Sequence, residues 1–358
     1  GLHIASALGA VCGKSSYGLE VLHDLNESSI SQAKQMVETQ RVTVGIAETP
    51  LKLYVKAIVT DSRGNTGYAV IENDHDNIAE TGFGETVLSS SHKENTCSDQ
   101  KTTLDYKLTV KEIFDFASTV AYEDIEFILE SRTLNLALAQ EGMRGPYGLR
   151  VGQAISASAN REVFGEDFLS YAMALTAAAS DARMAGCTLA AMSNSGSGNQ
   201  GITVTMPVIA YSLRYGTSDE QLARALVLSH LVAIHIKGYL GKLSALCGCV
   251  IASTGSACGL VYLRGGDYSQ ICAAIKNMIG NITGMVCDGA KVGCAMKVAS
   301  GVSSALQSAV LAREGICISS HDGIIEEDIE KTIRNLGRIG SVGMQNTDNM
   351  ILDIMVCK

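Results

Sequence analysis

Three cysteines have the spacing and surroundings expected of ligands to a metal cluster. Cys287 and Cys294 lie seven residues apart in a segment with glycines near both, and Cys247 lies in an earlier segment. Iron–sulfur clusters are held by thiolates that several parts of a chain supply. A cluster with only three protein thiolates leaves one iron open to act as a Lewis acid. The pattern therefore indicates an enzyme.

The spacing of these cysteines is also compatible with two alternatives. Cys287 and Cys294 could be ordinary core thiols at a glycine-containing bend, which the spacing alone supports as well as it supports a cluster. Zinc is a weaker candidate, because structural zinc sites usually use cysteines separated by about two to four residues. Cys249 is a further candidate neighbour of a cluster, because it lies two residues from Cys247.

A second segment, residues 193–201, contains only small and amide residues. Its glycines allow backbone N–H groups to converge on an anion, and its serines and asparagines add donors. A helix that starts after this segment would also favour negative charge. A flexible linker is the alternative, but amides are interspersed and apolar segments flank both sides. We therefore predict a loop that holds a substrate carboxylate through Ser193, Asn194, Ser195, Gly196, Ser197, Gly198, Asn199 and Gln200.

Other charged residues near these segments have less specific patterns. Asp181 and Arg183 lie just upstream of the glycine-rich loop, where they could form a buried ion pair or a clamp for a carboxylate. His230 and His235 are five residues apart, so they do not share one face of a helix and a metal-binding pair is not expected.

The composition is that of a large globular protein. The chain has 358 residues, of which 46% are apolar and 18% charged, and predicts one large or two ordinary domains. Its net charge of −9, without a basic stripe, argues against nucleic-acid and anionic-membrane partners.

Eleven cysteines, an odd number in a long chain, indicate reduced thiols and a cytoplasmic location rather than a disulfide scaffold. The start lacks a basic leader, and the apolar run over 242–264 predicts a buried helix pair.

The elements that must position these residues fall into two predicted domains of an α+β protein. Residues 1–103 predict a small α/β domain with an antiparallel sheet. A helix is expected over 19–37, and alternating apolar residues predict strands over 42–46, 51–59, 68–72 and 78–83. The polar residues 89–103 are expected to link the two domains.

Residues 104–358 predict a large all-helical domain that carries the chemistry. Thr109 and Ser218 each begin the pattern of a capping box, which marks the start of a helix. Apolar periodicity predicts helices over 109–130, 218–231, 267–279, 301–313 and 326–336.

Several longer motifs, in the right order, resemble the L-cysteine desulfidase family. This family includes uncharacterised bacterial members and is related to the α part of iron–sulfur L-serine dehydratases. The resemblance covers essentially the whole chain. Its motifs are Ser193-Asn-Ser-Gly-Ser-Gly-Asn-Gln-Gly201, Ser180-Asp-Ala-Arg-Met184, Leu243-Ser-Ala-Leu-Cys247 and Gly284-Met-Val-Cys287-Asp-Gly-Ala.

The resemblance implies an oxygen-sensitive 4Fe-4S cluster bound by Cys247, Cys287 and Cys294, with no pyridoxal phosphate. It also implies cleavage of L-cysteine to pyruvate, ammonia and sulfide. L-serine dehydration by the same residues is the second hypothesis, and a non-catalytic amino-acid or redox sensor is the third. The expected partner is a small amino-acid substrate, with no nucleic acid and no membrane, and a homodimer is the assembly considered.

The sequence departs from the family at its start. Members carry an upstream Ala-Leu-Gly-Cys-Thr-Glu-Pro motif whose cysteine is the proposed proton acceptor, and this motif is absent from the sequence. Cys12 follows a similar Ala-Leu-Gly, but its context matches a later family segment, so the role is not transferred to it. We expect either that the chain lacks its first segment or that its chemistry differs. The sequence therefore assigns no catalytic base.

Overall fold

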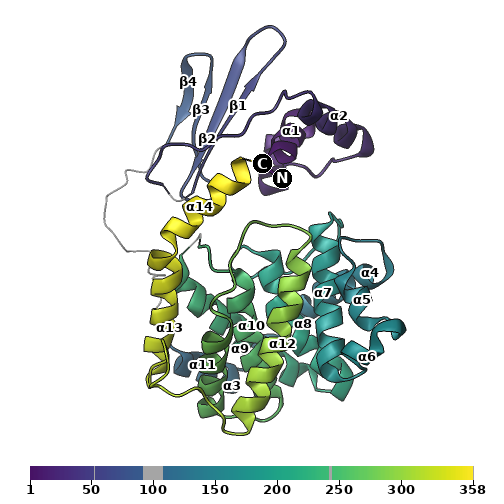
Figure 1. Cartoon of the computed structure of the whole chain (residues 1–358), viewed down its shortest axis with the longest axis vertical. Helices are drawn as coiled ribbons and strands as arrows, with labels where there is room; N and C mark the ends of the chain where they lie inside the picture. Colours follow the sequence, from purple (N-terminus) through teal and green to yellow (C-terminus); the bar gives the residue numbers. More distant parts are fainter. Residues whose placement is uncertain (52, 92–107, 242–243, 358) are drawn as a thin grey trace. The chain divides into compact units, whose positions relative to one another are not determined.

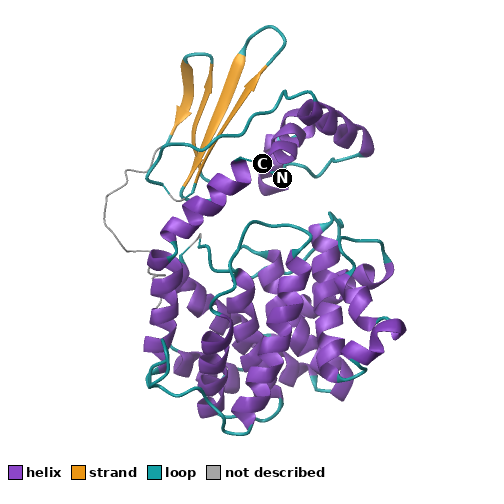
Figure 2. Ribbon diagram, in the orientation of Figure 1, coloured by secondary structure: helices purple, strands orange, loops and turns teal. Residues whose placement is uncertain are grey.

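The computed structural model describes residues 1–51, 53–91, 108–241 and 244–357 and divides the chain into two compact units. The N-terminal unit comprises Gly1–Asp99 together with Asn349–Lys358, and the helical unit comprises Gln100–Asp348. The N-terminal unit holds a four-stranded antiparallel sheet (Figure 1) and the rest is mostly helical (Figure 2). The α+β class predicted from the sequence is confirmed.

The sheet of the N-terminal unit is a meander in which each strand pairs with the next. The Asp61 carboxylate shapes the first turn, because its Oδ1 accepts from the backbone N–H groups of Arg63 and Asn65. Such side-chain acceptors stabilise tight turns between antiparallel strands. The elements are α1 (Leu2–Cys12), α2 (Glu27–Glu38), β1 (Tyr54–Thr60), β2 (Thr66–Glu72), β3 (Ile78–Phe83) and β4 (Thr86–Ser90).

Several boundaries in this unit differ from the prediction. The helix expected from residue 19 begins at Glu27, because the Asn26 side chain accepts from Ser29 N and caps it there. Residues 42–46 form no strand although their apolar residues alternate, since a strand also needs a neighbour to share its hydrogen bonds. Strand β4 was not predicted and takes the first two residues of the expected linker, whose residues 92–103 lie outside the described residues.

The helical unit is built around one central helix, α10, which is buried on all sides from Cys249 to Val261. It packs against α8, α9, α11 and α12. A helix that is apolar all round belongs in a core. The apolar run thus forms one buried helix, where a pair was expected. The elements are α3 (Val110–Thr119), α4 (Glu130–Arg144), α5 (Val151–Ser156), α6 (Arg161–Phe164), α7 (Phe168–Met184), α8 (Gly198–Tyr215), α9 (Asp219–Leu240), α10 (Gly248–Leu263), α11 (Tyr268–Ile282), α12 (Cys294–Arg313) and α13 (Ile329–Arg338). Helix α14 (Gln345–Val356) begins in this unit and belongs to the N-terminal unit from Asn349 onward.

Small residues allow the helices around α10 to approach closely. A Cβ at Gly255 would lie 2.3 Å from the carbonyl oxygen of Ser229 on α9, so only glycine fits there. Core helices packed this tightly tolerate little change in side-chain volume. Across the described ranges, no helix is both long and apolar enough to cross a membrane.

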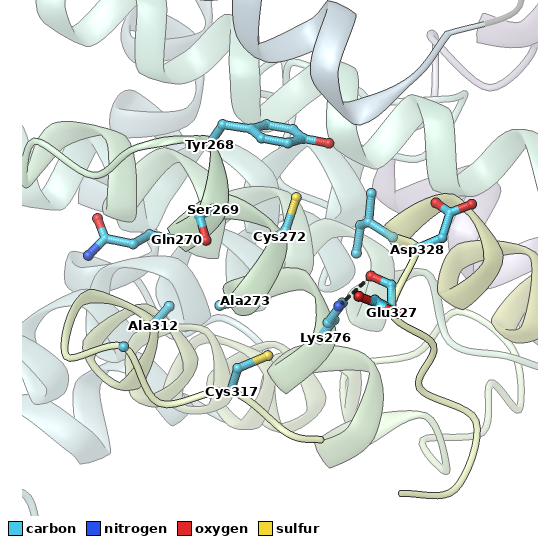
Figure 3. A pocket seen from close by; sticks show the side chains of 12 residues that line it. Tyr268, Ser269, Gln270, Cys272, Ala273, Lys276, Ala312, Cys317, Glu327 and Asp328 are labelled. Carbon is cyan, nitrogen blue, oxygen red and sulfur yellow. Dashed lines mark hydrogen bonds between the residues drawn. The ribbon is translucent and has the colours of Figure 1, made fainter. Parts of the chain in front are cut away.

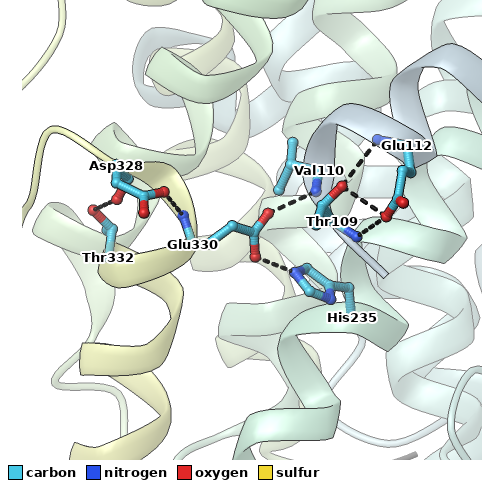
Figure 4. A network of polar contacts seen from close by, with 7 residues as sticks. All are labelled: Thr109, Val110, Glu112, His235, Asp328, Glu330 and Thr332. Atoms are coloured by element: carbon cyan, nitrogen blue, oxygen red, sulfur yellow. Dashed lines mark hydrogen bonds and ion pairs between the residues drawn. The ribbon is translucent and has the colours of Figure 1, made fainter. Parts of the chain in front are cut away.

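Polar contacts at the helix ends fix α3, α9 and α13 relative to one another (Figure 4). Thr109 forms the predicted capping box of α3, but this helix ends at Thr119 and not near residue 130. The Glu330 carboxylate of α13 accepts from Val110 N at 2.7 Å and bonds His235 Nε2 of α9, also at 2.7 Å. A charged acceptor shared by two helices is a strong, oriented contact. His235 therefore has a structural role.

Candidate functional site

A short antiparallel bridge brings two of the predicted cluster cysteines together. Cys247 N donates to Met285 O at 2.9 Å, and Cys287 N donates to Ala245 O at 2.7 Å. Cys247 is also the N-cap residue that immediately precedes α10. Two segments distant in sequence thus place the Cys247 and Cys287 thiols close enough to share a hydrogen bond.

Cys294 and Cys249 lie in different surroundings. Cys294 is the first residue of α12, and its sulfur lies within electrostatic range of the Arg183 guanidinium. Cys249 points into the contact between α10 and α12, where its Sγ donates to Lys297 O at 3.2 Å. A Cβ at Gly301 of α12 would lie 2.6 Å from this sulfur. Cys249 is therefore a packed core thiol, and Cys294 lies at a helix start.

Positive charge surrounds the paired thiols. Lys297 Nζ binds Asp288 Oδ1 at 2.6 Å and Val286 O at 2.7 Å, and Lys291 pairs with the same carboxylate. The hydrogen bond from Cys247 lowers the pKa of Cys287 well below its usual range, aided by the Gly289 backbone and by the lysines. The same hydrogen bond, with burial, raises the pKa of Cys247. One thiolate and one thiol are the favoured state of this pair.

The predicted substrate loop is an ordered turn, so the alternative of a flexible linker is wrong. Asn194 and Ser197 exchange two backbone hydrogen bonds of 3.1 and 3.0 Å across Ser195 and Gly196. Both central residues have positive φ, +49° and +78°, as in a type I′ turn. Ser197 then caps α8, because its side chain accepts from Gln200 N. A serine with positive φ is an uncommon conformation that often occurs at functional sites.

A buried amide network connects this loop to α9. The Asn194 Nδ2 group donates to His230 Nδ1 at 2.9 Å and to the carbonyl oxygen of His230 at 3.3 Å. Gln200 Nε2 donates to Asn194 Oδ1 at 2.7 Å, as does Ser195 Oγ at 3.1 Å. Because the His230 carbonyl can only accept, Asn194 Nδ2 must be the donor, and neutral His230 carries its proton on Nε2. That buried Nε2–H has no hydrogen-bond partner in the described protein.

The loop and the cysteines meet at the beginnings of three helices. A Cβ at Gly248, next to Cys247, would lie 3.0 Å from Gln200 Oε1, so α8 and α10 begin side by side. Arg183 packs over Gly198, the first residue of α8, and lies near Cys294 at the start of α12. Three helix N-termini add partial positive charge to this region. The site therefore suits anions.

The ion pair that the sequence allowed between Asp181 and Arg183 is not formed, and two further residues join the site. The carboxylate of Asp181 accepts from Gly152 N at 3.0 Å at the start of α5, so it forms no ion pair with Arg183. Lys237, which was not predicted, lies near enough to Cys287 to interact with its charge. His230 and Lys237 are seven residues apart, which places them on one face of α9. This seven-residue spacing is the sequence signal from which both residues could have been predicted to lie at the site.

The cysteines fit a cluster better than they fit a single ion. Within the described ranges, no three His, Cys, Asp or Glu side chains are grouped around one metal position. A cubane cluster binds each thiolate at a different iron, so its ligands need not surround one point. Three cysteines beside two lysines and helix N-termini supply the thiolates and the opposite charge that an anionic cluster requires. The donor set fits this group.

A separate cavity of about 520 Å³ lies away from these residues. Figure 3 shows Cys272, Cys317 and Lys276 among its lining side chains, with Lys276 Nζ bonded to Glu327 O at 2.8 Å. The cavity also contacts Ala312 near the end of α12, whereas Cys294 begins that helix. It is therefore not part of the cysteine site.

The buried His230 makes acid stability a testable property of the site. Burial lowers the pKa of His230 to about 4, so between pH 6.5 and pH 4 the unfolded chain binds a proton that the folded one does not. Stability should therefore fall as the pH falls through this window, by about 3 kcal/mol from this residue. His230→Gln keeps an acceptor for Asn194 and should flatten this fall. Urea unfolding followed by circular dichroism at several pH values measures it, and parallel curves for the two proteins would contradict it.

Comparison with known proteins identifies relatives along the whole chain. A UPF0597 protein of Phocaeicola vulgatus is 47% identical over 360 residues, covering 100% of this chain and 83% of the relative. A UPF0597 protein of Oleidesulfovibrio alaskensis is 48% identical over 359 residues, with the same two shares. One from Porphyromonas gingivalis is 43% identical over 363 residues, covering 100% of this chain and 84% of the relative.

A family model described as serine dehydratase alpha chain matches residues 16–353. The match includes the three cysteines, the loop at 193–201 and Arg183. It confirms the predicted relation to serine dehydratases and supports a lyase of the dehydratase type, dependent in general on an iron–sulfur cluster. The preference for L-cysteine is a finer prediction that this match does not test. On the extent of these similarities, the chain belongs to the serine dehydratase alpha chain family.

Proposed function

We propose that this protein is an iron–sulfur lyase that eliminates sulfide from L-cysteine. The observation that carries the proposal is the pairing of Cys247 with Cys287 beside the start of α12, where Cys294 lies. In the proposal these three cysteines hold a 4Fe-4S cluster. When bound, the cluster would supply an open iron as a Lewis acid for the leaving sulfur.

The protein residues would bind and orient the amino acid and stabilise charge. The turn at Ser195 and Gly196 and the start of α8 offer backbone N–H groups to an anion. Lys297, held by Asp288, keeps positive charge beside the thiolates. Loss of the α-proton and of the β-sulfur as hydrogen sulfide leaves an enamine, which water converts to pyruvate and ammonia. The residue that accepts the α-proton is not assigned.

L-serine dehydration is the second candidate, because the matching family is named for serine dehydratase. It would use the same residues and differ only in the leaving group, water in place of hydrogen sulfide. Reduced thiols and an oxygen-sensitive cluster support a cytoplasmic location for either activity.

The test is an assay on anaerobically purified protein whose iron and sulfide contents are measured first. Pyruvate and sulfide are then quantified with L-cysteine, and pyruvate with L-serine. We expect a brown protein that forms pyruvate and sulfide in equal amounts from L-cysteine. Pyruvate from L-serine alone would replace the first candidate by the second. A cluster-loaded protein that forms no pyruvate from either would favour the amino-acid or redox sensor.

A further inference from the structure

We propose that Arg183 binds the α-carboxylate of the amino-acid ligand. The inference rests on the proposed function, since that function brings an amino acid to the cysteines. It adds to that function by assigning the shape of the site and the recognition of the carboxylate to different residues. The turn at Ser195 and Gly196 would shape the site, and the arginine would recognise the carboxylate.

Arg183 is a guanidinium without an acidic partner in the described part of the chain. Its Nη1 contacts two uncharged acceptors, Asn199 Oδ1 at 3.4 Å and Met184 Sδ at 3.2 Å. Arg224 and Arg132, in contrast, have carboxylate partners at 2.8 and 2.6 Å. Burial lowers the pKa of Arg183, and only the charge of Cys294 acts in the opposite direction. A planar guanidinium in this condition matches a carboxylate that binds through both oxygens.

The position of Arg183 supports the same role. A Cβ at Gly198 would lie 2.2 Å from Arg183 Nε, so the side chain lies directly on the first residue of α8. Cys294, a proposed cluster ligand, is within electrostatic range of the same guanidinium. A carboxylate bound here would meet both the arginine and the positive end of a helix. Its amino acid would lie between the loop and the cysteines.

The amide side chains of the loop are not free for this task. Asn194 uses its amide nitrogen on His230 and its oxygen on Gln200 and Ser195. Gln200 in turn gives its Nε2 to Asn194. Their hydrogen-bonding capacity is thus largely used within the protein, and they fix the turn. Arg183, whose side chain contacts Asn199 and Met184 and no carboxylate, remains as a cationic donor for a carboxylate.

A buried donor without a partner lies in the amide network of Asn194. His230 Nε2 is buried, carries the proton and has no partner among the described residues, while its Nδ1 is held by Asn194. A buried donor without a partner costs free energy unless a ligand or water satisfies it. The unsatisfied Nε2–H group of His230 is an observation independent of Arg183, and it also indicates that the region accommodates a polar ligand.

The test measures equilibrium binding of L-alanine and ethylamine by anaerobic titration calorimetry to the cluster-loaded protein. L-alanine has no β leaving group, so it binds without elimination, and ethylamine is the same molecule without its carboxylate. The variants are Arg183→Gln and Arg183→Lys. Arg313→Gln is the matched control, because it removes the same charge from the far end of α12, about 30 Å from Cys294.

We expect Arg183→Gln to weaken L-alanine binding about 100-fold, the loss of two charge-assisted hydrogen bonds, with Arg183→Lys intermediate. Ethylamine should bind weakly and equally to all four proteins, and Arg313→Gln should match the wild type. Unchanged L-alanine affinity in Arg183→Gln overturns the proposal, as does a wild type that binds no L-alanine. A wild type that binds L-alanine through Arg183 but forms no pyruvate defeats the proposed function and leaves the arginine's role standing.

Discussion

Cys287→Ala is expected to yield a colourless protein that retains no cluster and no lyase activity. Cys287 contributes one of three proposed thiolates, and the Cys247 thiol and Lys297 stabilise its charge. Two ligands, Cys247 and Cys294, would remain. The segment that carries Asp288 and Cys294 would then bind a cluster through one thiolate in place of two. Removal of a metal Lewis acid costs several kcal/mol of transition-state stabilisation, so pyruvate formation should fall by at least about 1000-fold. Iron content, visible absorbance and pyruvate release measure the effect.

Cys249→Ala is the control that separates a ligand from a nearby thiol. It lies two residues from Cys247, but its sulfur bonds Lys297 O and faces Gly301 within the core. This variant should lose some stability through a small cavity and still retain its iron and its colour. Equal iron loss in both variants, or an iron-free Cys287→Ala protein with full activity, would contradict the proposed ligand set.

Local patterns in the sequence predicted several elements because the interactions that form these elements join residues close together in the sequence. The capping boxes at Thr109 and Ser218 satisfy N–H groups within four residues, and both are present in the structure. The meander over β1, β2 and β3 follows from alternation and short turns. The helix limits were less accurate, as α12 begins at Cys294 and not at residue 301. Helix ends depend on what the neighbouring segments pack against.

The relations that define the site could not be predicted, because they join residues far apart in sequence. Nothing local to Asn194 indicates that His230 will accept its hydrogen bond, and nothing local to Asp181 indicates that it will bind the start of α5. Pairs of this kind form only when tertiary packing brings the helices together. The sequence therefore predicted which residue types carry the chemistry. Which of them are already hydrogen bonded required the packing of α7, α8 and α9.

Gly201→Ala should be among the most damaging small substitutions in the chain. A Cβ at this position would lie 1.9 Å from the Met192 carbonyl oxygen and 2.7 Å from Ser193 Cα, both of them backbone atoms. The same stretch of chain is tied down by Asn135, whose Oδ1 accepts from Met192 N at 3.0 Å. The backbone at Met192 and the start of α8 cannot move apart without breaking buried hydrogen bonds. We therefore expect a loss of about 3 kcal/mol or more in the free energy of unfolding.

The comparison that isolates this effect is Gly196→Ala in the same loop. Gly196 has a φ of +78° with open space around its Cα, so alanine there costs only backbone strain, about 1 kcal/mol. Urea unfolding should rank Gly201→Ala well below Gly196→Ala in stability. Because the clash pushes residues 192 and 193 away from α8, it should also weaken L-alanine binding in whatever fraction stays folded. If the two variants are equally stable, the close packing of this loop against α8 is not what holds the turn beside the cysteines.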